Sequence, residues 1–263
     1  MDKPPAGQAD FWDRRAASFP RYNEVPGSYE ETVLAQAEAG GVDFRGRTVL
    51  DVGAGSGQFT LKLAQRAARV VALDISEKML GISRADALAH GLSNIDYVLA
   101  PFPGFPPGRR FDVVFCSMCP AVRDDQSRQR LLDLAGGALV HVGFRDYSEP
   151  GPMARLIGHY GLERKLFRSG PEMRRWMEAR GETFKSFHLA GEWEVRHSRA
   201  EALAWCRTML LDYGVERPDE GLILELLEPF WDPAAGSHVF RTPYSVELLV
   251  HGCPRQPAGA GQR

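Results

Sequence analysis

The segment Thr48–Thr60 constrains the fold of this 263-residue chain more than any other. It reads TVLDVGAGSGQFT: an apolar strand that ends at Asp51, a loop with three alternating glycines, and the start of a helix. Glycine has no Cβ, so such a loop turns sharply and lets a flat ligand lie against its backbone. The dinucleotide fingerprint G-x-G-x-x-G requires another glycine where this chain has Gln58. We therefore expect a ligand site at this loop, and a nicotinamide dinucleotide fits it poorly.

A second apolar run, Val70–Leu73, is followed by another acid, Asp74. A carboxylate at the end of a strand can accept hydrogen bonds from both hydroxyls of a ribose. Two acids at strand ends, the first followed by G-x-G-x-G, form a pattern that resembles class I S-adenosylmethionine-dependent methyltransferases. The resemblance runs from about Val42 to Phe144 and is looser elsewhere.

The resemblance implies S-adenosylmethionine as cofactor and S-adenosylhomocysteine as product, with no metal. In that family the glycine loop lies beneath the methionine and ribose parts, and acids at the positions of Asp51 and Asp74 contact the ammonium group and the ribose. For Asp51, Met79 and Ser117 the alternatives are structural: tying down the loop, filling the core and capping a strand end. The cofactor-binding residues that we expect are Asp51, Gly53, Ala54, Gly55, Gly57, Asp74, Ile75, Met79, Phe102, Cys116 and Ser117.

The chain departs from the family pattern after its third and fourth predicted strands. Relatives commonly carry an acid that accepts from the adenine amino group, whereas this chain has Ala100-Pro101-Phe102, which leaves Phe102 to stack on the ring. Residues 116–120 read CSMCP, where nucleic-acid amino-methyltransferases carry Asn or Asp followed by Pro-Pro and an aromatic. The second departure disfavours methylation of bases.

Cys116 and Cys119 form a C-x-x-C motif. Thioredoxin-type pairs lie at a helix N-terminus, which lowers the thiol pKa, but Cys116 ends a predicted strand. A zinc site needs two further ligands, and Cys206 and Cys253 are isolated. We therefore expect Cys116 and Cys119 to pack as small side chains beside the strand end.

Alternating apolar and amphipathic stretches predict βαβ units around a parallel sheet. The expected fold class is α/β: a doubly wound, seven-stranded, mostly parallel Rossmann-like sheet with helices on both faces and a helical, aromatic C-terminal elaboration. Ser76 is the expected N-cap of the second helix. The predicted strands are 48–52, 70–74, 95–99, 111–116 and 138–144, and the helices lie near 57–67, 77–90 and 124–135.

The flanking segments predict further organisation. Phe187–Arg196 alternates apolar and polar residues like a half-buried strand, and Ser198 with Glu201 forms a capping box for a helix that runs to about Tyr213. The possible lid residues are Trp12, Phe19 and Tyr22, with plain covering of the sheet as the alternative. The expected segments are a mobile N-terminus (1–9), a helical lid (10–47), the cofactor-binding core (48–144), an elaboration that forms part of the substrate pocket (145–243), a final strand (244–251) and a mobile tail (254–263).

The charge balance bears on the partners of the chain. Its 32 basic and 34 acidic residues give a formal net charge of -2, so no general attraction to nucleic acid or membranes is expected. The sequence shows no apolar run of membrane-spanning length and no signal-peptide core at MDKPPAGQAD, which predicts a cytoplasmic protein.

The expected function is methyl transfer to an unidentified small molecule by in-line displacement. The alternative is an S-adenosylmethionine-binding protein without transfer activity, acting as a sensor or assembly partner, and a nicotinamide oxidoreductase ranks third. No catalytic base stands out, and a soft or deprotonated nucleophile needs none. The residues considered for that role are His141, Asp146, Tyr147, His188, Glu192 and His197.

Overall fold

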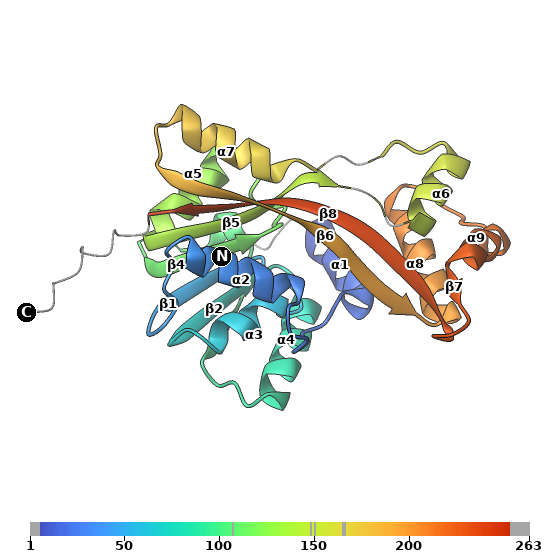
Figure 1. Cartoon of the computed structure of the whole chain (residues 1–263), viewed down its shortest axis with the longest axis horizontal. Coiled ribbons are helices and arrows are strands. Elements are labelled where there is room, and N and C mark those ends of the chain that lie inside the picture. The colour runs from blue at the N-terminus through green and yellow to red at the C-terminus, as the bar shows by residue number, and fades with distance from the viewer. Residues whose placement is uncertain (1–5, 107, 148, 150, 165–166, 253–263) are drawn as a thin grey trace, which may run out of the picture. The chain divides into compact units, whose positions relative to one another are not determined.

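The computed structural model describes residues 6–106, 108–147, 149, 151–164 and 167–252, and it shows an α/β fold (Figure 1). The strands are β1 (Thr48–Val52), β2 (Arg69–Asp74), β3 (Ile95–Leu99), β4 (Phe111–Ser117), β5 (Ala135–Tyr147), β6 (Phe184–His197), β7 (Trp231–Asp232) and β8 (Ser237–His251). The α-helices are α1 (Ala6–Arg15), α2 (Tyr29–Ala39), α3 (Gln58–Ala64), α4 (Glu77–Ala89), α5 (Asp125–Leu134), α6 (Gly151–Tyr160), α7 (Ser169–Ala179), α8 (Arg199–Asp212) and α9 (Glu220–Leu227). Short 3-10 turns occupy Ala16–Ser18, Phe102–Gly104 and Glu228–Phe230.

The strands form one sheet with the order β3-β2-β1-β4-β5-β8-β6, and β7 pairs with β8. The pairs β3 with β2, β2 with β1, β1 with β4, and β4 with β5 are parallel. The strand order therefore reverses at β1: β2 and β3 follow on one side, β4 and β5 on the other. This doubly wound sheet confirms the predicted fold class.

The central strands are buried because helices cover both of their faces. Four of the five residues of β1 are buried, in keeping with its nearly continuous apolar sequence. Helices α5 and α7 lie on one face of the sheet, and α2, α3 and α4 lie on the other (Figure 1). Leu50 and Val52 of β1 share a core cluster with Leu131 of α5 and Met177 of α7, and we call it the α5/α7 core cluster. These two side chains of β1 therefore point to the face that α5 and α7 cover.

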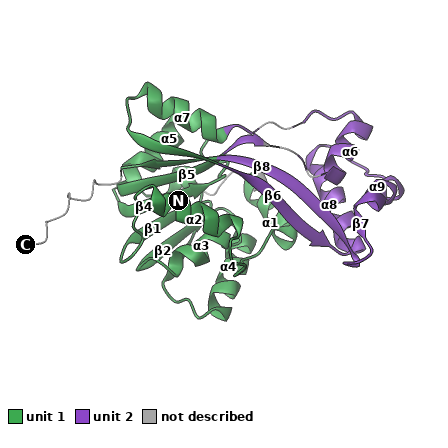
Figure 2. Cartoon of the chain, viewed as in Figure 1, with its two compact units in different colours: residues 1–143, 169–188, 247–263 green, residues 144–168, 189–246 purple. Residues whose placement is uncertain are grey.

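The chain divides into two compact units (Figure 2). Unit 1 comprises residues 1–143, 169–188 and 247–263, and unit 2 comprises residues 144–168 and 189–246. Unit 2 has its own core, in which Leu156 of α6, Cys206 of α8 and Ile223 of α9 are buried together. Strands β5, β6 and β8 contribute residues to both units.

Both predicted helix caps are present. Ser76 caps α4 by accepting a hydrogen bond from the backbone N–H of Met79. Ser198 and Glu201 form a reciprocal capping box at the start of α8, and Tyr213 is the C-cap of that helix. Local sequence therefore determines where these two helices begin.

Several expected boundaries differ from the observed elements. Helix α1 begins at Ala6, inside the segment 1–9, whereas residues 1–5 and the tail 254–263 lie outside the described residues. Residues 169–188 group with unit 1 instead of with the rest of the segment 145–243. Val195 is exposed although it alternates in phase with partly buried Trp193. The last two differences depend on long-range packing, which strand periodicity does not report.

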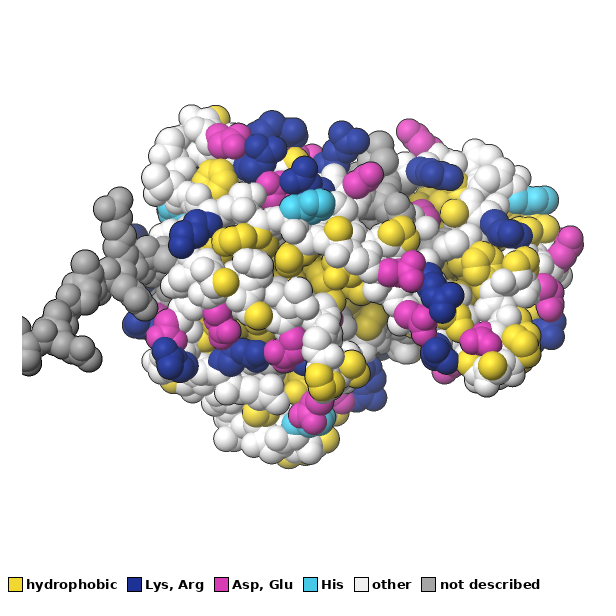
Figure 3. Space-filling model, viewed as in Figure 1, with side chains coloured by type: hydrophobic (Ala, Val, Ile, Leu, Met, Phe, Trp, Pro, Cys, Tyr) yellow, Lys and Arg dark blue, Asp and Glu magenta, His cyan; other side chains and the backbone are white. Residues whose placement is uncertain are grey.

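The described residues contain neither a membrane-spanning helix nor a metal-binding cluster. Within the described ranges, no helix has the length and apolar content needed to cross a bilayer. Over the same part of the chain, no three His, Cys, Asp or Glu side chains are grouped so that they could hold a metal ion. On the face drawn in Figure 3, basic and acidic side chains are interspersed rather than sorted by sign.

Candidate functional site

The carboxyl ends of β1 and β4 lie side by side where the strand order reverses. Val52 is the register partner of Cys116, so the glycine loop and the turn after β4 leave the sheet at neighbouring points. Ligands of open α/β sheets bind at such a switch point. The predicted cofactor loop therefore occupies the position where this topology places a ligand.

Asp74, at the end of β2, holds the glycine loop. The backbone N–H of Gly55 donates to one carboxylate oxygen (2.8 Å), and the N–H of Ser76 donates to the other (2.8 Å). Burial raises the pKa of Asp74, and these backbone donors offset part of that rise. Gly53 and Ala54 donate to the carbonyl of Leu73, at 2.9 and 3.0 Å. The loop is thus tied to the end of β2 through both side chain and backbone.

The three glycines of the loop all have left-handed backbone conformations. Their φ angles are +75° at Gly53, +55° at Gly55 and +92° at Gly57, a region that other L residues rarely adopt. A Cβ built on Gly53 would lie 2.7 Å from the sulfur of Cys119, whereas one on Gly55 would meet only the Phe19 ring, at 3.8 Å. The loop is therefore packed from below at Gly53 and contacted by an aromatic ring at Gly55.

Asp51 is buried beneath the loop with 2% of its surface exposed. Thr60 of α3 donates a hydrogen bond of 2.6 Å to the carboxylate. Burial raises the pKa of Asp51 to about 7; Thr60 opposes the rise and the charge of Asp74 adds to it. Asp51 thus ties β1 to α3, the structural role considered above, and its contact with the cofactor ammonium stays a prediction.

The N-terminal segment lies on the loop and on the start of α4. Asp13 of α1 accepts hydrogen bonds from the Ser76 hydroxyl (2.5 Å) and the Lys78 backbone N–H (3.2 Å). The Ser56 hydroxyl donates to the carbonyl of Pro20 (2.5 Å), which holds the end of the segment on the glycine loop. Two of the three lid candidates, Trp12 and Phe19, meet edge to face at 6.3 Å.

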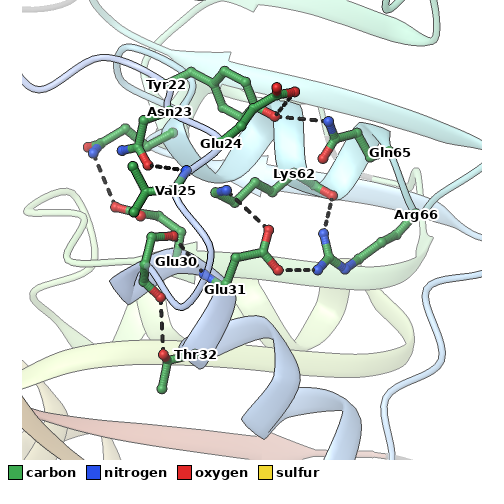
Figure 4. A network of polar contacts seen from close by, with 12 residues as sticks. Tyr22, Asn23, Glu24, Val25, Glu30, Glu31, Thr32, Lys62, Gln65 and Arg66 are labelled. Carbon is green, nitrogen blue, oxygen red and sulfur yellow. Dashed lines mark hydrogen bonds and ion pairs between the residues drawn. The ribbon is translucent and has the colours of Figure 1, made fainter.

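The third lid candidate, Tyr22, lies over α3 and belongs to the network of Figure 4. Its hydroxyl accepts a hydrogen bond of 2.9 Å from Gln65, and its ring lies 5.2 Å from the ammonium of Lys62. Lys62 is buried and pairs with Glu31 at 3.1 Å. Burial opposes ionisation of Glu31, but hydrogen bonds from Lys62 and Arg66 outweigh it and lower the pKa. This network anchors the segment that follows Phe19.

The remaining predicted cofactor residues differ in exposure. Ile75 and Ser117 are partly exposed, whereas Met79 is 1% exposed and Ala54 joins a small cluster with Ala72 and Leu80. Phe102 is buried in the α5/α7 core cluster, and the Arg130 guanidinium lies 6.0 Å from its ring. Phe102 therefore packs with the core, and its stacking on adenine stays a prediction, as does the core alternative for Met79.

The structure describes the side chains of five of the six residues considered as a base. Among these five, only His141 is buried. Burial, reinforced by the charge of Arg128, lowers its pKa to about 4. Its Nδ1 has no hydrogen-bond partner among the residues that the structure describes. His197 is partly buried against Phe240, with ring centroids 4.8 Å apart. Neither arrangement identifies a general base, and the side chain of Tyr147 lies outside the described residues.

Sequence reasoning missed four side chains that shape the site. Asp13, Ser56, Thr60 and Cys119 contact the loop or the residues that hold it. For Thr60 a signal existed, because it lies in the first turn of the helix that directly follows the glycine loop. Asp13 and Ser56 engage partners from distant or irregular segments, which no periodic pattern reveals.

A comparison with known families identifies the domain that contains the glycine loop. Residues 49–143 match a family described as "Methyltransferase domain". The chain therefore contains a class I S-adenosylmethionine-dependent methyltransferase domain. The matched residues run from β1 to the part of β5 in unit 1, so they include the glycine loop, Asp74 and the Cys116–Ser117 turn.

Curated relatives resemble the methyltransferase domain in sequence. A ubiquinone biosynthesis O-methyltransferase of an Azoarcus species is 41% identical over 73 residues, 27% of this chain and 31% of that protein. The protein of the same description from Bordetella avium is 33% identical over 146 residues, 54% of this chain and 56% of the relative. In these matches the chain spans less than two thirds of the relative's own length.

Solved structures resemble the fold. Precorrin 8w decarboxylase of Methanobacterium thermoautotrophicum matches with a TM-score of 0.52 and 15% identity, over 90% of this chain and 97% of that one. A phosphoethanolamine N-methyltransferase of Haemonchus contortus matches with a TM-score of 0.52 and 14% identity, over 96% of this chain and 61% of that one. At these identities the likeness shows a shared fold.

Proposed function

We propose that this protein binds S-adenosylmethionine at the carboxyl edge of β1, β2 and β4 and transfers its methyl group to a small molecule. The observation that supports this most is the carboxylate of Asp74, which holds the N–H of Gly55 and so presents the glycine loop at the switch point of a methyltransferase domain. A cytoplasmic location and the lack of nucleic-acid or membrane partners, expected from charge and composition, belong to the same proposal.

In this proposal the acids at the strand ends recognise opposite parts of the cofactor. Each oxygen of Asp74 already accepts one backbone N–H and has further lone pairs for the ribose hydroxyls. Asp51, when ionised, attracts the ammonium group of the methionine part. Ile75 and Met79 pack beside the adenine. With Ala100 in place of an acid, adenine is held by packing rather than by a carboxylate.

When bound, the cofactor supplies an electrophilic methyl group on a sulfonium. The protein's task is to place a nucleophile in line with that methyl group and to exclude competing water. The segment from α1 to Pro20 covers the loop through the Ser56 and Ser76 hydrogen bonds, and so serves the second part of the task. We propose an oxygen nucleophile first, because the two curated relatives described above are named as O-methyltransferases.

The test is transfer of a labelled methyl group from S-adenosylmethionine to a panel of small hydroxylated aromatic acceptors, with thiol and amine acceptors beside them. Label in any acceptor, together with S-adenosylhomocysteine release that Asp74→Ala reduces at subsaturating cofactor, supports the proposal. Tight cofactor binding with no transfer to any acceptor class would favour a sensor or assembly protein instead.

A further inference from the structure

The C-x-x-C motif places two thiols directly beneath the proposed cofactor loop. Cys116 is fully buried at the end of β4, and Cys119 is partly exposed in the turn that follows. Both are free thiols of unit 1. The proposed methyl transfer uses neither side chain.

The turn between the two cysteines is tight and folds Cys119 back toward Cys116. Met118 has φ +50°, the one positive φ at a non-glycine residue among those described, and its N–H donates 2.8 Å to the carbonyl of Val142. The side chain of Cys119 packs against the core cluster that contains Cys116. The turn and this packing bring the two side chains to the same place in the fold, as a disulfide requires.

The chemistry of the two thiols is unequal. The hydrogen bond with Cys119 and burial together raise the pKa of Cys116 well above its usual range, so Cys116 keeps its proton. Cys119 is partly exposed, so it is the more accessible of the two thiols. An oxidant from solvent therefore meets Cys119 first, with Cys116 positioned as the second thiol.

Cys119 also supports the loop. A Cβ on Gly53 would lie 2.7 Å from the Cys119 sulfur and 2.9 Å from its Cβ, so this side chain fills the space that glycine leaves open. Gly53 in turn donates 2.9 Å to Leu73 and begins the loop that Asp74 holds. A change in the rotamer of Cys119 removes this support and lets the loop move.

We propose that Cys116 and Cys119 form a peroxide-sensitive thiol pair whose disulfide weakens cofactor binding. The Cys119 thiol releases its proton, the thiolate attacks one oxygen of hydrogen peroxide, and the O–O bond breaks to give a sulfenic acid and hydroxide. The hydroxide takes up the released proton and leaves as water. The Cys116 sulfur then attacks the Cys119 sulfur, an S–S bond forms as the S–O bond breaks, and the Cys116 proton leaves with the hydroxyl as a second water. Peroxide is reduced, two thiols are oxidised, and a dithiol restores the reduced pair.

The test starts from full-length protein with Cys253→Ser, which removes a thiol outside the described residues. Peroxide is expected to lower the mass of the protein, and of the tryptic peptide Phe111–Arg123 that carries both cysteines, by about 2 Da. Both thiols should then resist alkylation, and dithiothreitol should reverse these changes. Saturating S-adenosylhomocysteine should slow the reaction. Affinity for S-adenosylhomocysteine, measured calorimetrically, should fall by about tenfold or more on oxidation and recover on reduction.

Matched variants separate the pair from general oxidation. Cys116→Ala and Cys116→Ser, two variants in case one fails to fold, should give sulfenic or higher acids on Cys119 and no intramolecular disulfide. Cys206→Ser, buried in unit 2, should oxidise like the parent protein.

Two results would overturn the inference: no Cys116–Cys119 disulfide under peroxide, or a complete disulfide that leaves affinity unchanged. The affinity measurement rests on the proposed function, whereas the disulfide mapping does not. Failure of the reduced protein to bind cofactor would therefore count against the function, and the peptide map would still decide the thiol chemistry.

Discussion

Asp74 performs two tasks at the residue scale: it holds the loop, and it is the proposed ribose acceptor. Replacing Asp74 by Ala removes both hydrogen-bond acceptors and leaves the N–H groups of Gly55 and Ser76 without their partner. We expect Asp74→Ala to weaken binding of S-adenosylmethionine by about ten- to hundredfold, measured by titration calorimetry. Asp96→Ala, which removes a partly exposed acid that pairs with Arg69 on the neighbouring strand, should bind normally. Equal affinity of Asp74→Ala and the wild type would remove Asp74 from the site.

Asp51 gives the site a dependence on pH. Its pKa is raised from 3.8 to about 7 by burial, so the folded protein retains a proton that the unfolded chain releases between these values. The stability that this proton confers is present at low pH and is lost as the pH rises through about 7. Asp51→Asn abolishes this loss, so denaturant unfolding should show the variant gaining stability over the wild type between about pH 4 and pH 7.

Cofactor affinity should move in the opposite direction. Ionised Asp51 attracts the ammonium group, so wild-type affinity is expected to rise with pH through about 7, whereas Asp51→Asn binds weakly throughout. Parallel pH profiles of affinity in the two proteins would show that Asp51 has only its structural role with Thr60.

Residue types at the strand ends could be predicted from the sequence, but their surroundings could not. Asp51 and Asp74 stand at the predicted strand ends because each closes an apolar run. The Phe19 ring against Gly55 and the Cys119 thiol against Gly53 join segments that share no pattern. Gly55 combines a left-handed φ with a hydrogen bond from its N–H to Asp74. Composition alone does not reveal this pairing of residues.

At the scale of elements, Gly57 sets the junction between the loop and α3. It has φ +92°, and an added Cβ would collide with Ser83 and lie 2.9 Å from a Leu61 methyl carbon. Gly57→Ala should therefore lower the free energy of unfolding by more than the roughly 1–2 kcal/mol of backbone strain alone. Gly46→Ala, at φ +69° with open space around it, should show the strain alone, and equal losses in urea titrations would argue against the packing constraint.

Helix α1 depends on Asp13 for its attachment to α4. Asp13→Ala removes the acceptor for the Ser76 hydroxyl and the Lys78 N–H, so we expect faster hydrogen exchange over α1 and faster dissociation of the cofactor. Asp10→Ala, an exposed acid on the same helix, controls for helix propensity and charge. If both variants exchange alike, α1 is held by other contacts.

Elements were predictable where they are buried on both faces or capped locally. Strand β1 has the predicted bounds because it is a buried, mostly apolar run between turn residues. Strand β3 also has the predicted bounds, although its residues are only partly buried or exposed. Strand β5 begins earlier, at Ala135, which pairs with Phe111; the register then shifts and resumes at Ala138 opposite Val113. The glycines between them have weak strand propensity, so the pattern does not predict this extension. Helices α6 and α7 were not predicted, since their apolar faces are defined by distant partners.

At the scale of the whole molecule, the two units have separate cores. Ser198 caps α8 in unit 2, so Ser198→Ala should lower stability by about 1 kcal/mol. Its cofactor affinity should stay within about twofold of the wild type, because the proposed site lies in unit 1. A matching loss of affinity in calorimetry would show that unit 2 supports the cofactor site directly.

The central claim is that the loop after β1 binds S-adenosylmethionine. Calorimetric titration of the reduced protein with S-adenosylmethionine, S-adenosylhomocysteine, NAD and NADP tests it most directly. We predict saturable binding of the first two ligands, with one site per chain, and no heat of binding from the nicotinamide dinucleotides. Absence of binding by S-adenosylmethionine and S-adenosylhomocysteine, or binding of NAD or NADP in their place, would contradict the account.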